Sequence, residues 1–551
     1  MAATSRHKLV MFNSPAAFWS GAVAIAGGVL LHLPDYVGAA GMGYRMVGMP
    51  MGSGMLVGMA LVVVGFLLAA HGLVPLTALH KAQVPRAAVD RSDRYIRAMN
   101  DARLSGAHWG LLTVLGVALI IDVMKPATLG FVMPGMREEY GYSTAQVAML
   151  PTVALTGTTV GSLLWGVLAD RVGRRAAILL ATLMFIGTSI CGFMPEFKWN
   201  LVMCFLMGTS AGGMLPIVYA LMTECMPSKN RGWLVVLHAG LGTVGGYLAA
   251  SGMAALLEPH FAWRSLWFVG LPTGVLMLIM SRWIPESPRF LLTHGREREA
   301  EAVLARFGVT VPAAGDVVEA PVAPTPAPAP APAGSRNRLL ALLRPPLSGQ
   351  TLTVVTYGLG WGLVNWGFLT FIPVTLRSRG LDAGMATRLL FYSALLAIPG
   401  TIVVAWLYGM WSSKKSMVVF ALATALALVG FAVIDPGSNG EPSVWLTPLM
   451  VLLLVSSGGV ISMLSPYAAE VYPTHLRGTA SGVAAGSSKL GGIIAPTTMA
   501  ALAAVQPGFT LIGLAFAVPL VVSAGMVAFS GIETRGRHLE DTAGERVPAV
   551  P

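Results

Sequence analysis

Apolar residues along this chain come in long runs separated by short polar stretches. Each run is about 20 residues or longer, the length that an α-helix needs to cross the hydrocarbon core of a bilayer. The pattern therefore predicts an all-α integral membrane protein. The predicted spans are 15–33, 54–79, 106–132, 147–168, 176–194, 199–223, 233–257, 263–284, 351–374, 387–410, 416–434, 444–469, 479–502 and 508–531.

The spans form two early helices followed by a core of twelve. Between the sixth and seventh core spans lies the longest polar stretch, which contains Ala-Pro repeats from Ala320 to Pro332. Proline removes amide donors and favours extended chain, so this stretch is predicted to be a tether and not a packed domain. The predicted divisions are an N-terminal extension with two helices and a basic cytoplasmic loop, a six-helix bundle, a linker, a second six-helix bundle and a cytoplasmic tail, at 1-105, 106-284, 285-350, 351-532 and 533-551.

The first span allows a second interpretation. Arg6, His7 and Lys8 precede an apolar run from Ala16 to Leu33, and a possible cleavage site follows at 38–40. This is also the order of parts in a secretory signal peptide. The run is long for a signal, and its removal would leave the topology of the core unchanged.

Composition supports the membrane assignment. Hydrophobic residues make up 55% of the chain and charged residues 11%, whereas soluble domains carry charge on about 25% of their residues. The mean hydropathy is +0.70. The 64 glycines suit helices that pack closely in lipid.

The formal net charge of +11 does not indicate a nucleic-acid-binding surface, because the basic residues lie in short loops between the apolar runs. Positive charge is enriched in cytoplasmic loops. The bias predicts a multi-pass protein of the cell (inner or plasma) membrane, with both ends of the twelve-helix core in the cytoplasm. One loop on the opposite face departs from the bias, since it carries Arg377 and Arg379.

No nucleotide-binding loop, zinc-ligand spacing or catalytic triad stands out in the sequence. Cys191, Cys204 and Cys225 all lie in or beside apolar runs, which indicates neither disulfides nor a metal site. The glycine-rich runs fall inside apolar helices and not between a strand and a helix, so they do not indicate a phosphate loop. We therefore expect no cofactor, no metal, no nucleic-acid partner and no enzymatic activity.

An internal repeat organises the core. Glu224-x-x-Pro227-x-x-x-Arg231-Gly232 recurs as Glu470-x-x-Pro473-x-x-x-Arg477-Gly478. Each copy lies at the predicted cytoplasmic end of the fourth helix of its half. Such repeats are typical of two-lobed carriers that work by alternating access. The glutamates and arginines are either parts of a charged gate or helix-end charges at the lipid headgroups.

A second motif lies between the second and third core spans and resembles the loop signature of the major facilitator superfamily. It reads Gly166-Val-Leu-Ala-Asp170-Arg171-Val-Gly173-Arg174-Arg175. Gly166 is expected to allow close helix contact, Asp170 to meet a cation or a helix N-terminus, and Gly173 to permit a tight turn. The second half has only a worn copy, from Gly409 to Lys415, without the acidic residue.

Two further stretches narrow the resemblance. Residues 285–289, Pro-Glu-Ser-Pro-Arg, and residues 531–540, Gly-Ile-Glu-Thr-Arg-Gly-Arg-His-Leu-Glu, are similar to sugar-porter signatures shared with metabolite:proton symporters, including niacin and aromatic acid carriers. The resemblance covers about 106–540. It implies a two-lobed twelve-helix carrier, working as a monomer on a small-molecule substrate and protons. One departure is Cys204, where such carriers usually have an arginine before Phe205-Leu206.

Charged residues inside membrane spans are costly and usually functional. Asp122 lies deep in the first core span with Lys125 at i+3, on the same helix face. The two form either a structural bridge or a site at which Asp122 exchanges a proton and Lys125 attracts an anion. Glu224 and His238 are further proton-coupling candidates, although a lone buried histidine is more often simply hydrogen-bonded.

The substrate-binding candidates, besides Lys125, are Trp361, Asn365, Trp366 and Lys489. An amide among aromatic rings suits an organic solute with a ring and few polar groups, although aromatic packing explains the tryptophans equally well. Lys489 is a second candidate for anion recognition. We expect a proton-coupled carrier of a small organic anion, such as an aromatic carboxylate. The alternatives are a sugar or polyol carrier, an exporter of drug-like solutes, or a non-transporting sensor on the same fold.

Overall fold

The protein was studied as a computed structural model that describes residues 13–73, 98–100, 102–309, 335–434, 437–438, 441–473, 476–505 and 509–534. Fourteen helices in these residues are long and apolar enough to cross a membrane, which confirms the predicted fold class. The strands in this part of the chain are the antiparallel pair β1 (Gly437–Ser438) and β2 (Glu441–Pro442).

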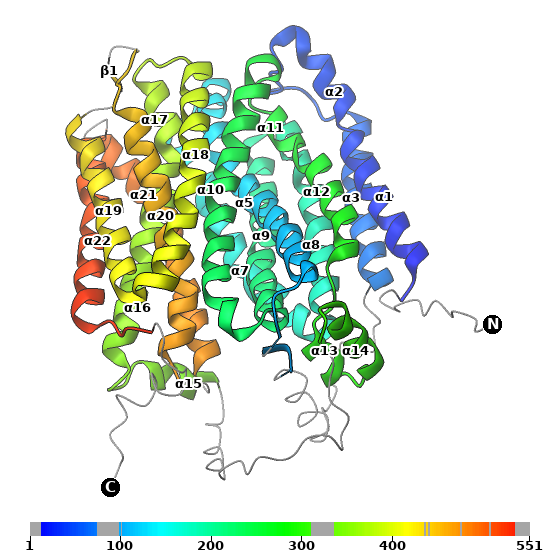
Figure 1. Ribbon diagram of the computed structural model, residues 1–551. Coiled ribbons are helices and arrows are strands. Elements are labelled where there is room, and N and C mark those ends of the chain that lie inside the picture. Colours follow the sequence, from blue (N-terminus) through cyan, green and yellow to red (C-terminus); the bar gives the residue numbers. More distant parts are fainter. Residues whose placement is uncertain are drawn as a thin grey trace, which may run out of the picture. The chain divides into compact units, whose positions relative to one another are not determined.

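The helices before the linker include the two early spans and the first six core spans (Figure 1). They are α1 (Pro15–Leu30), α2 (Leu33–Gly38), η1 (Ala39–Met42), α3 (Ser53–Leu73), α5 (Gly106–Tyr140), α6 (Thr144–Val147), α7 (Met149–Val172), α8 (Arg174–Gly187), η3 (Thr188–Phe193), α9 (Phe197–Cys225), α10 (Ser228–Phe261), α11 (Ser265–Phe268), α12 (Gly270–Met280), η4 (Ser281–Trp283), α13 (Pro288–Thr293) and α14 (Glu297–Arg306).

The helices after the linker form the second half of the core. They are α15 (Ser335–Leu342), α16 (Ser348–Leu363), η5 (Val364–Phe368), η6 (Leu369–Phe371), α17 (Ile372–Ser378), α18 (Ala383–Trp406), η7 (Leu407–Trp411), α19 (Ser413–Ile434), α20 (Leu446–Val471), α21 (Arg477–Val505) and α22 (Thr510–Ser530).

The chain forms two compact units that cut across its two sequence halves. The first comprises Met1–Ala118, Val160–Arg231 and Arg264–Val311. The second comprises Leu119–Thr159, Gly232–Trp263 and Pro312–Pro551. Helices α5 and α7 therefore contribute to both units, and α10 packs with the second half of the sequence.

The two early helices belong to the first unit and pack on α8 (Figure 1). A Cβ at Gly21 would lie 2.4 Å from the carbonyl oxygen of Gly65, and one at Gly28 would lie 2.6 Å from that of Gly58. Glycine lets the backbones of α1 and α3 approach this closely, as small residues do in membrane helices. The hairpin meets α8 at Gly187, where a Cβ would lie 2.9 Å from Val62.

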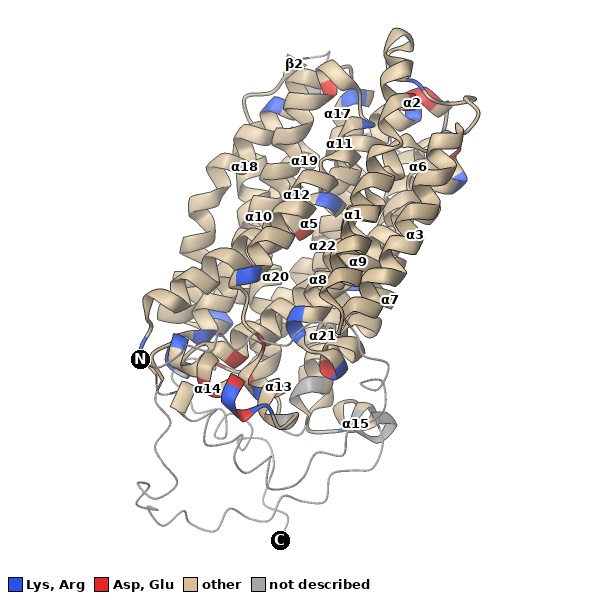
Figure 2. Cartoon of the chain, turned by 90° about the vertical axis from the view of Figure 1, so that its right-hand side faces the viewer, with Lys and Arg blue, Asp and Glu red and all other residues tan. Residues whose placement is uncertain are grey.

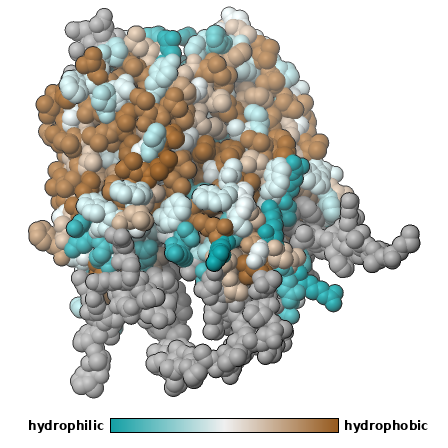
Figure 3. Space-filling model, viewed as in Figure 1, coloured by the Kyte–Doolittle hydropathy of each residue, from teal (hydrophilic) through white to brown (hydrophobic). Residues whose placement is uncertain are grey.

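In the second unit, α10 uses glycines to press against α5. Cβ atoms at Gly242, Gly245 and Gly246 would lie within 3.0 Å of side-chain atoms of Leu119, Ile120 and Val123. This contact fixes the stretch of α5 that carries Asp122. The face drawn in Figure 3 is largely apolar over the helices, while Lys, Arg, Asp and Glu gather near helix ends such as those beside α13 and α14 (Figure 2).

Candidate functional site

A buried pair of opposite charges lies in the second unit. Asp122 of α5 is 6% exposed and Lys125, one helical turn further on, is 3% exposed. The cation whose charge acts on the Asp122 carboxyl is Lys489 of α21. Sequence reasoning placed Lys489 only on the substrate side, so its coupling to Asp122 is a finding of the structure.

Lys489 is positioned by glycines on both sides of the contact between α16 and α21. A Cβ at Gly362 would lie 2.1 Å from the carbonyl oxygen of Ser488, and one at Gly491 would lie 2.3 Å from that of Leu359. The backbones therefore touch directly beside Lys489. The ammonium Nζ also lies 3.4 Å from the carbonyl oxygen of Thr158 in α7.

The seventh core helix loses its regular α-helical form next to this contact. Helix α16 passes into a π-helical turn, η5, and then into a 3₁₀ turn, η6, before α17 resumes. Such irregular turns are frequent at functional sites. The π turn carries Asn365 and Trp366, and a Cβ at Gly492 would lie 2.7 Å from the Trp366 ring. Trp366 thus lies against the glycines that follow Lys489.

The other candidate residues for substrate and proton binding differ in their surroundings. The Trp361 indole Nε1 is buried and has no hydrogen-bond partner among the described residues. His238 of α10 is 5% exposed, and its Nδ1 lies 3.0 Å from the Leu234 carbonyl oxygen in the preceding turn. Tyr247, which sequence reasoning missed, is 6% exposed, and its hydroxyl has no hydrogen-bond partner in the part of the chain that the structure describes. Its ring centroid lies 5.6 Å from that of Phe131 in α5.

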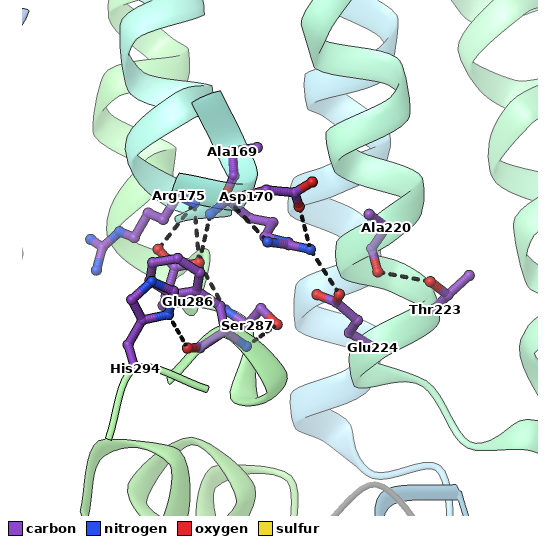
Figure 4. A network of polar contacts seen from close by, with 11 residues as sticks. Ala169, Asp170, Arg175, Ala220, Thr223, Glu224, Glu286, Ser287 and His294 are labelled. Carbon is purple, nitrogen blue, oxygen red and sulfur yellow. Dashed lines mark hydrogen bonds and ion pairs between the residues drawn. The ribbon is translucent and has the colours of Figure 1, made fainter. Parts of the chain in front are cut away.

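The loop motif between α7 and α8 is organised by Glu286, which lies in the Pro-Glu-Ser-Pro-Arg signature but was not among the predicted site residues (Figure 4). Its carboxylate accepts hydrogen bonds from the backbone amides of Arg174 at 2.7 Å, Arg175 at 3.3 Å and Ser287 at 3.0 Å. A carboxylate at a helix N-terminus satisfies amides that have no partner within the helix. Burial raises the pKa of Glu286, whereas these amides and the Arg174 charge act to lower it.

The two motif glycines play different parts. Gly173 has a φ of 104°, and a Cβ there would lie 2.3 Å from the Glu286 carboxylate. The position therefore requires glycine both for its backbone angle and for the approach of Glu286. The expectation for Gly166 does not hold among the residues that the structure describes, since none of their atoms lies within 4 Å of a Cβ placed there.

Arg174 joins two carboxylates of the first unit. Its guanidinium lies 3.1 Å from Asp170 and 3.2 Å from Glu224 (Figure 4). Arg231 does not complete this network as expected, since its guanidinium donates to the Asn100 side chain at 2.7 Å and to the Met226 carbonyl at 3.0 Å. The reason is geometric: Arg174 reaches Glu224 from α8, while Arg231 folds back over the turn between α9 and α10. Arg171 is exposed and Arg175 is half-buried.

The corresponding region of the second half uses hydroxyl groups. Glu470 accepts hydrogen bonds from Tyr408 at 2.9 Å and from Thr534 at 2.5 Å. Glu533 accepts from the Ser413 amide at 3.0 Å and from its hydroxyl at 2.6 Å. Glu533, from beyond α22, thus binds the start of α19, while the worn motif itself has no counterpart of Asp170. The side chain of Arg477 lies outside the described part of the chain.

No group of three or more His, Cys, Asp or Glu that could hold a metal ion occurs in the residues the structure describes. The arrangement has instead what a carrier requires. Charged and aromatic groups lie around a broken helix in one unit, and ion pairs lie at helix ends in the other. Such discontinuous helices are typical of the substrate and ion sites of secondary transporters.

Sequence comparison identifies the family to which these features belong. The sequence profile of the Major Facilitator Superfamily matches residues 115–496, more than half of the chain. The chain belongs to the Major Facilitator Superfamily. It is therefore a multi-pass membrane transporter and not an enzyme, and members of this superfamily move small-molecule substrates.

Individual members resemble the chain over most of their length. It is 26% identical to the niacin transporter NiaP of Acinetobacter baylyi over 79% of this chain and 96% of that protein. It is also 26% identical to the 4-hydroxybenzoate transporter PcaK of the same organism, over 79% and 94%. Among solved structures, the proton:xylose symporter XylE matches with a TM-score of 0.61 and 16% identity, covering 80% of this chain and 99% of that one. This last likeness shows the fold alone.

Proposed function

We propose that this transporter moves a small organic anion, an aromatic or other carboxylate, together with protons. The observation that carries the proposal is the electrostatic coupling between buried Asp122 of α5 and half-buried Lys489 of α21. A buried carboxylate and ammonium are costly unless each compensates the other. Their retention inside a transporter favours a functional role over a purely structural one.

The pair suggests how proton and anion binding are linked. When Asp122 is ionised, its charge neutralises Lys489, and a substrate carboxylate gains little by approaching. When Asp122 is protonated, the Lys489 charge is available to a substrate anion. Each ligand then strengthens the binding of the other, since linkage between two sites is reciprocal. Glu224 and His238 remain alternative proton sites.

The surroundings of the pair favour an aromatic substrate with few polar groups. Trp366 and Asn365 lie in the π turn beside the glycines that follow Lys489. The Trp361 indole and the Tyr247 hydroxyl offer buried polar groups without partners among the described residues. Unsatisfied buried groups cost about 1–3 kcal/mol each, so a bound solute that engages them regains free energy. Besides half-buried Lys489 of α21, the buried Lys125 of α5 offers a second cation.

The names of the relatives agree with this substrate class. Niacin and 4-hydroxybenzoate, after which NiaP and PcaK are named, are both ring carboxylates. A sugar, a drug-like cation and a non-transporting sensor are the alternatives. We further propose that the protein works as a monomer in the cell membrane with the ends of its core in the cytoplasm, as the loop charges suggest.

The test is uptake into proteoliposomes under an imposed pH gradient, acidic outside. The solutes are niacin, 4-hydroxybenzoate, xylose and a quaternary ammonium dye. We expect gradient-dependent accumulation of at least one carboxylate and none of xylose or the dye. Vesicles without a gradient, and vesicles carrying Lys489→Met, serve as controls. Accumulation of only xylose or only the dye would contradict the anion proposal.

A further inference from the structure

A buried ion pair joins helices from the two sequence halves within the second unit. Arg377, near the end of α17, donates a hydrogen bond through Nη2 to the carboxylate Oε1 of Glu258, near the end of α10. The two side chains are 12% and 10% exposed. Because α10 precedes the linker and α17 follows it, the pair ties the first half of the core to the second.

The pair explains an exception in the charge pattern. Arg377 is a basic residue on the face that the loop charges assign to the outside, where arginine is disfavoured. Because Arg377 pairs with Glu258 inside the protein, its charge does not count among the exposed loop charges that set the orientation. Arg377 is retained at this place as a partner for Glu258 and not as a topology signal.

A second contact between the two sequence halves lies two helical turns inward from Arg377, where the backbones of α5 and η6 meet. A Cβ at Gly130 of α5 would lie 2.6 Å from the carbonyl oxygen of Thr370 in η6. Thr370 is 7% exposed. The far ends of α5 and α10 are therefore closed against the broken seventh helix, between the ion pair and the π turn that carries Trp366.

Two further carboxylates act on Glu258 beside its pairing with Arg377. Besides Arg377, the carboxylates of Glu138 and Asp382 act electrostatically on Glu258. Like charges repel, so Glu258 is held in place by Arg377 against two carboxylates. The second carboxylate oxygen of Glu258 is buried without a hydrogen-bond partner among the described residues. The pair is thus incompletely compensated, and water that enters on opening solvates both charges.

We propose that Glu258 and Arg377 form the latch of the outer gate. The pair is intact while the path from the outside is closed, and it breaks when the central site opens outward. The inference rests on the proposed alternating-access function but not on the identity of the substrate. It deepens that function by naming the contact that must be exchanged in each cycle.

The test uses an accessibility reporter that needs no substrate. Thr370→Cys places a thiol of similar size behind the latch, in purified protein reconstituted into liposomes and labelled with a membrane-impermeant maleimide. The parent protein, with its three buried cysteines, gives the background. The latch is then altered by Arg377→Gln, by Glu258→Gln, and by the charge exchange Glu258→Arg with Arg377→Glu. Arg388→Gln is the matched control, because Arg388 lies in the neighbouring α18 and donates to the Gly384 carbonyl of its own helix.

Loss of the latch should shift the population toward the outward-open state. We expect labelling of the reporter to accelerate about tenfold in each single variant, the effect of about 1.4 kcal/mol on a two-state equilibrium. The charge exchange should return labelling toward the parent rate, and Arg388→Gln should leave it unchanged. Parent-like labelling in both single variants would overturn the proposal, as would equal acceleration by Arg388→Gln. If Arg377→Gln fails to insert, Glu258→Gln, which preserves shape, decides alone. Because the readout needs no solute, failure of the latch can be told apart from failure of the anion proposal.

Discussion

Glu286 and Glu533 perform the same task in the two halves of the core. Each follows the last helix of its half, and each accepts a hydrogen bond from a backbone amide at the start of the third helix. Glu286 binds the Arg174 amide at 2.7 Å and Glu533 binds the Ser413 amide at 3.0 Å. The two halves therefore repeat this contact, which Glu286 and Glu533 of the two signature stretches make.

The two halves nevertheless hold the glutamate of the internal repeat, Glu224 or Glu470, with different chemistry. In the first half the guanidinium of Arg174 lies beside Glu224. In the second half the hydroxyls of Tyr408 and Thr534 donate to Glu470. Both sets of hydrogen bonds are charge-assisted, because the acceptor is a carboxylate in each, but only the first half adds a compensating cation. Loss of a charge should therefore weaken the first-half network more than the second-half one, because it breaks the contact between Arg174 and Glu224. Variants of Arg174 and its partners are the ones that test the network best.

Gly173→Ala should destabilise the protein, because alanine at a φ of 104° is strained and its Cβ would meet the Glu286 carboxylate. We expect a loss of about 1–3 kcal/mol. Gly166→Ala, seven residues away in the same motif, should keep or slightly raise stability, since its Cβ meets open space and alanine favours helix by about 0.5–1 kcal/mol. Thermal unfolding in detergent measures both. Equal losses would show that the two glycines are not distinguished by their surroundings.

Asp170→Asn should leave the fold intact but slow transport. Its carboxylate is 73% exposed and shares Arg174 with Glu224, so its contribution to stability is small. At a moving interface the lost charge should reduce turnover by up to about tenfold, or about 1.4 kcal/mol. Initial uptake rates at equal protein in the membrane measure the effect. Turnover equal to the parent would remove any gating role for the motif.

Tyr247→Phe tests whether the unpaired hydroxyl faces substrate. Removing a buried hydroxyl without a partner should keep or raise stability, while a lost contact to solute should raise KM about tenfold, equivalent to about 1.4 kcal/mol. Tyr357→Phe is the control, since the Tyr357 hydroxyl donates to the Met417 carbonyl at 3.3 Å. That variant should lose stability and keep its KM. An unchanged KM in Tyr247→Phe would exclude the hydroxyl from the binding site.

The sequence was sufficient for the fold and for the family. Apolar runs of bilayer length specify helices whatever their packing, and the loop between α7 and α8 is a contiguous motif. The contact partners of the charged site residues could not be predicted from the sequence, because they come from helices that are distant along the chain. Arg231 follows Glu224 in the sequence repeat, whereas Arg174 belongs to the loop motif. Only packing decides that Arg174 is the one that reaches Glu224. Likewise the i, i+3 spacing draws attention to Lys125, but it gives no sign that Lys489, from another helix, also acts on Asp122.

The central claim is that Asp122 exchanges the proton that drives accumulation. Asp122→Asn resembles the protonated carboxyl at all times, so substrate should still bind and cross the membrane. The decisive measurement compares this variant with the parent in proteoliposomes, for accumulation of a transported carboxylate under a pH gradient and for exchange of labelled against unlabelled substrate without one. The account predicts that Asp122→Asn loses accumulation and retains exchange. Accumulation equal to that of the parent would contradict it and would leave Glu224 and His238 as the sites to examine.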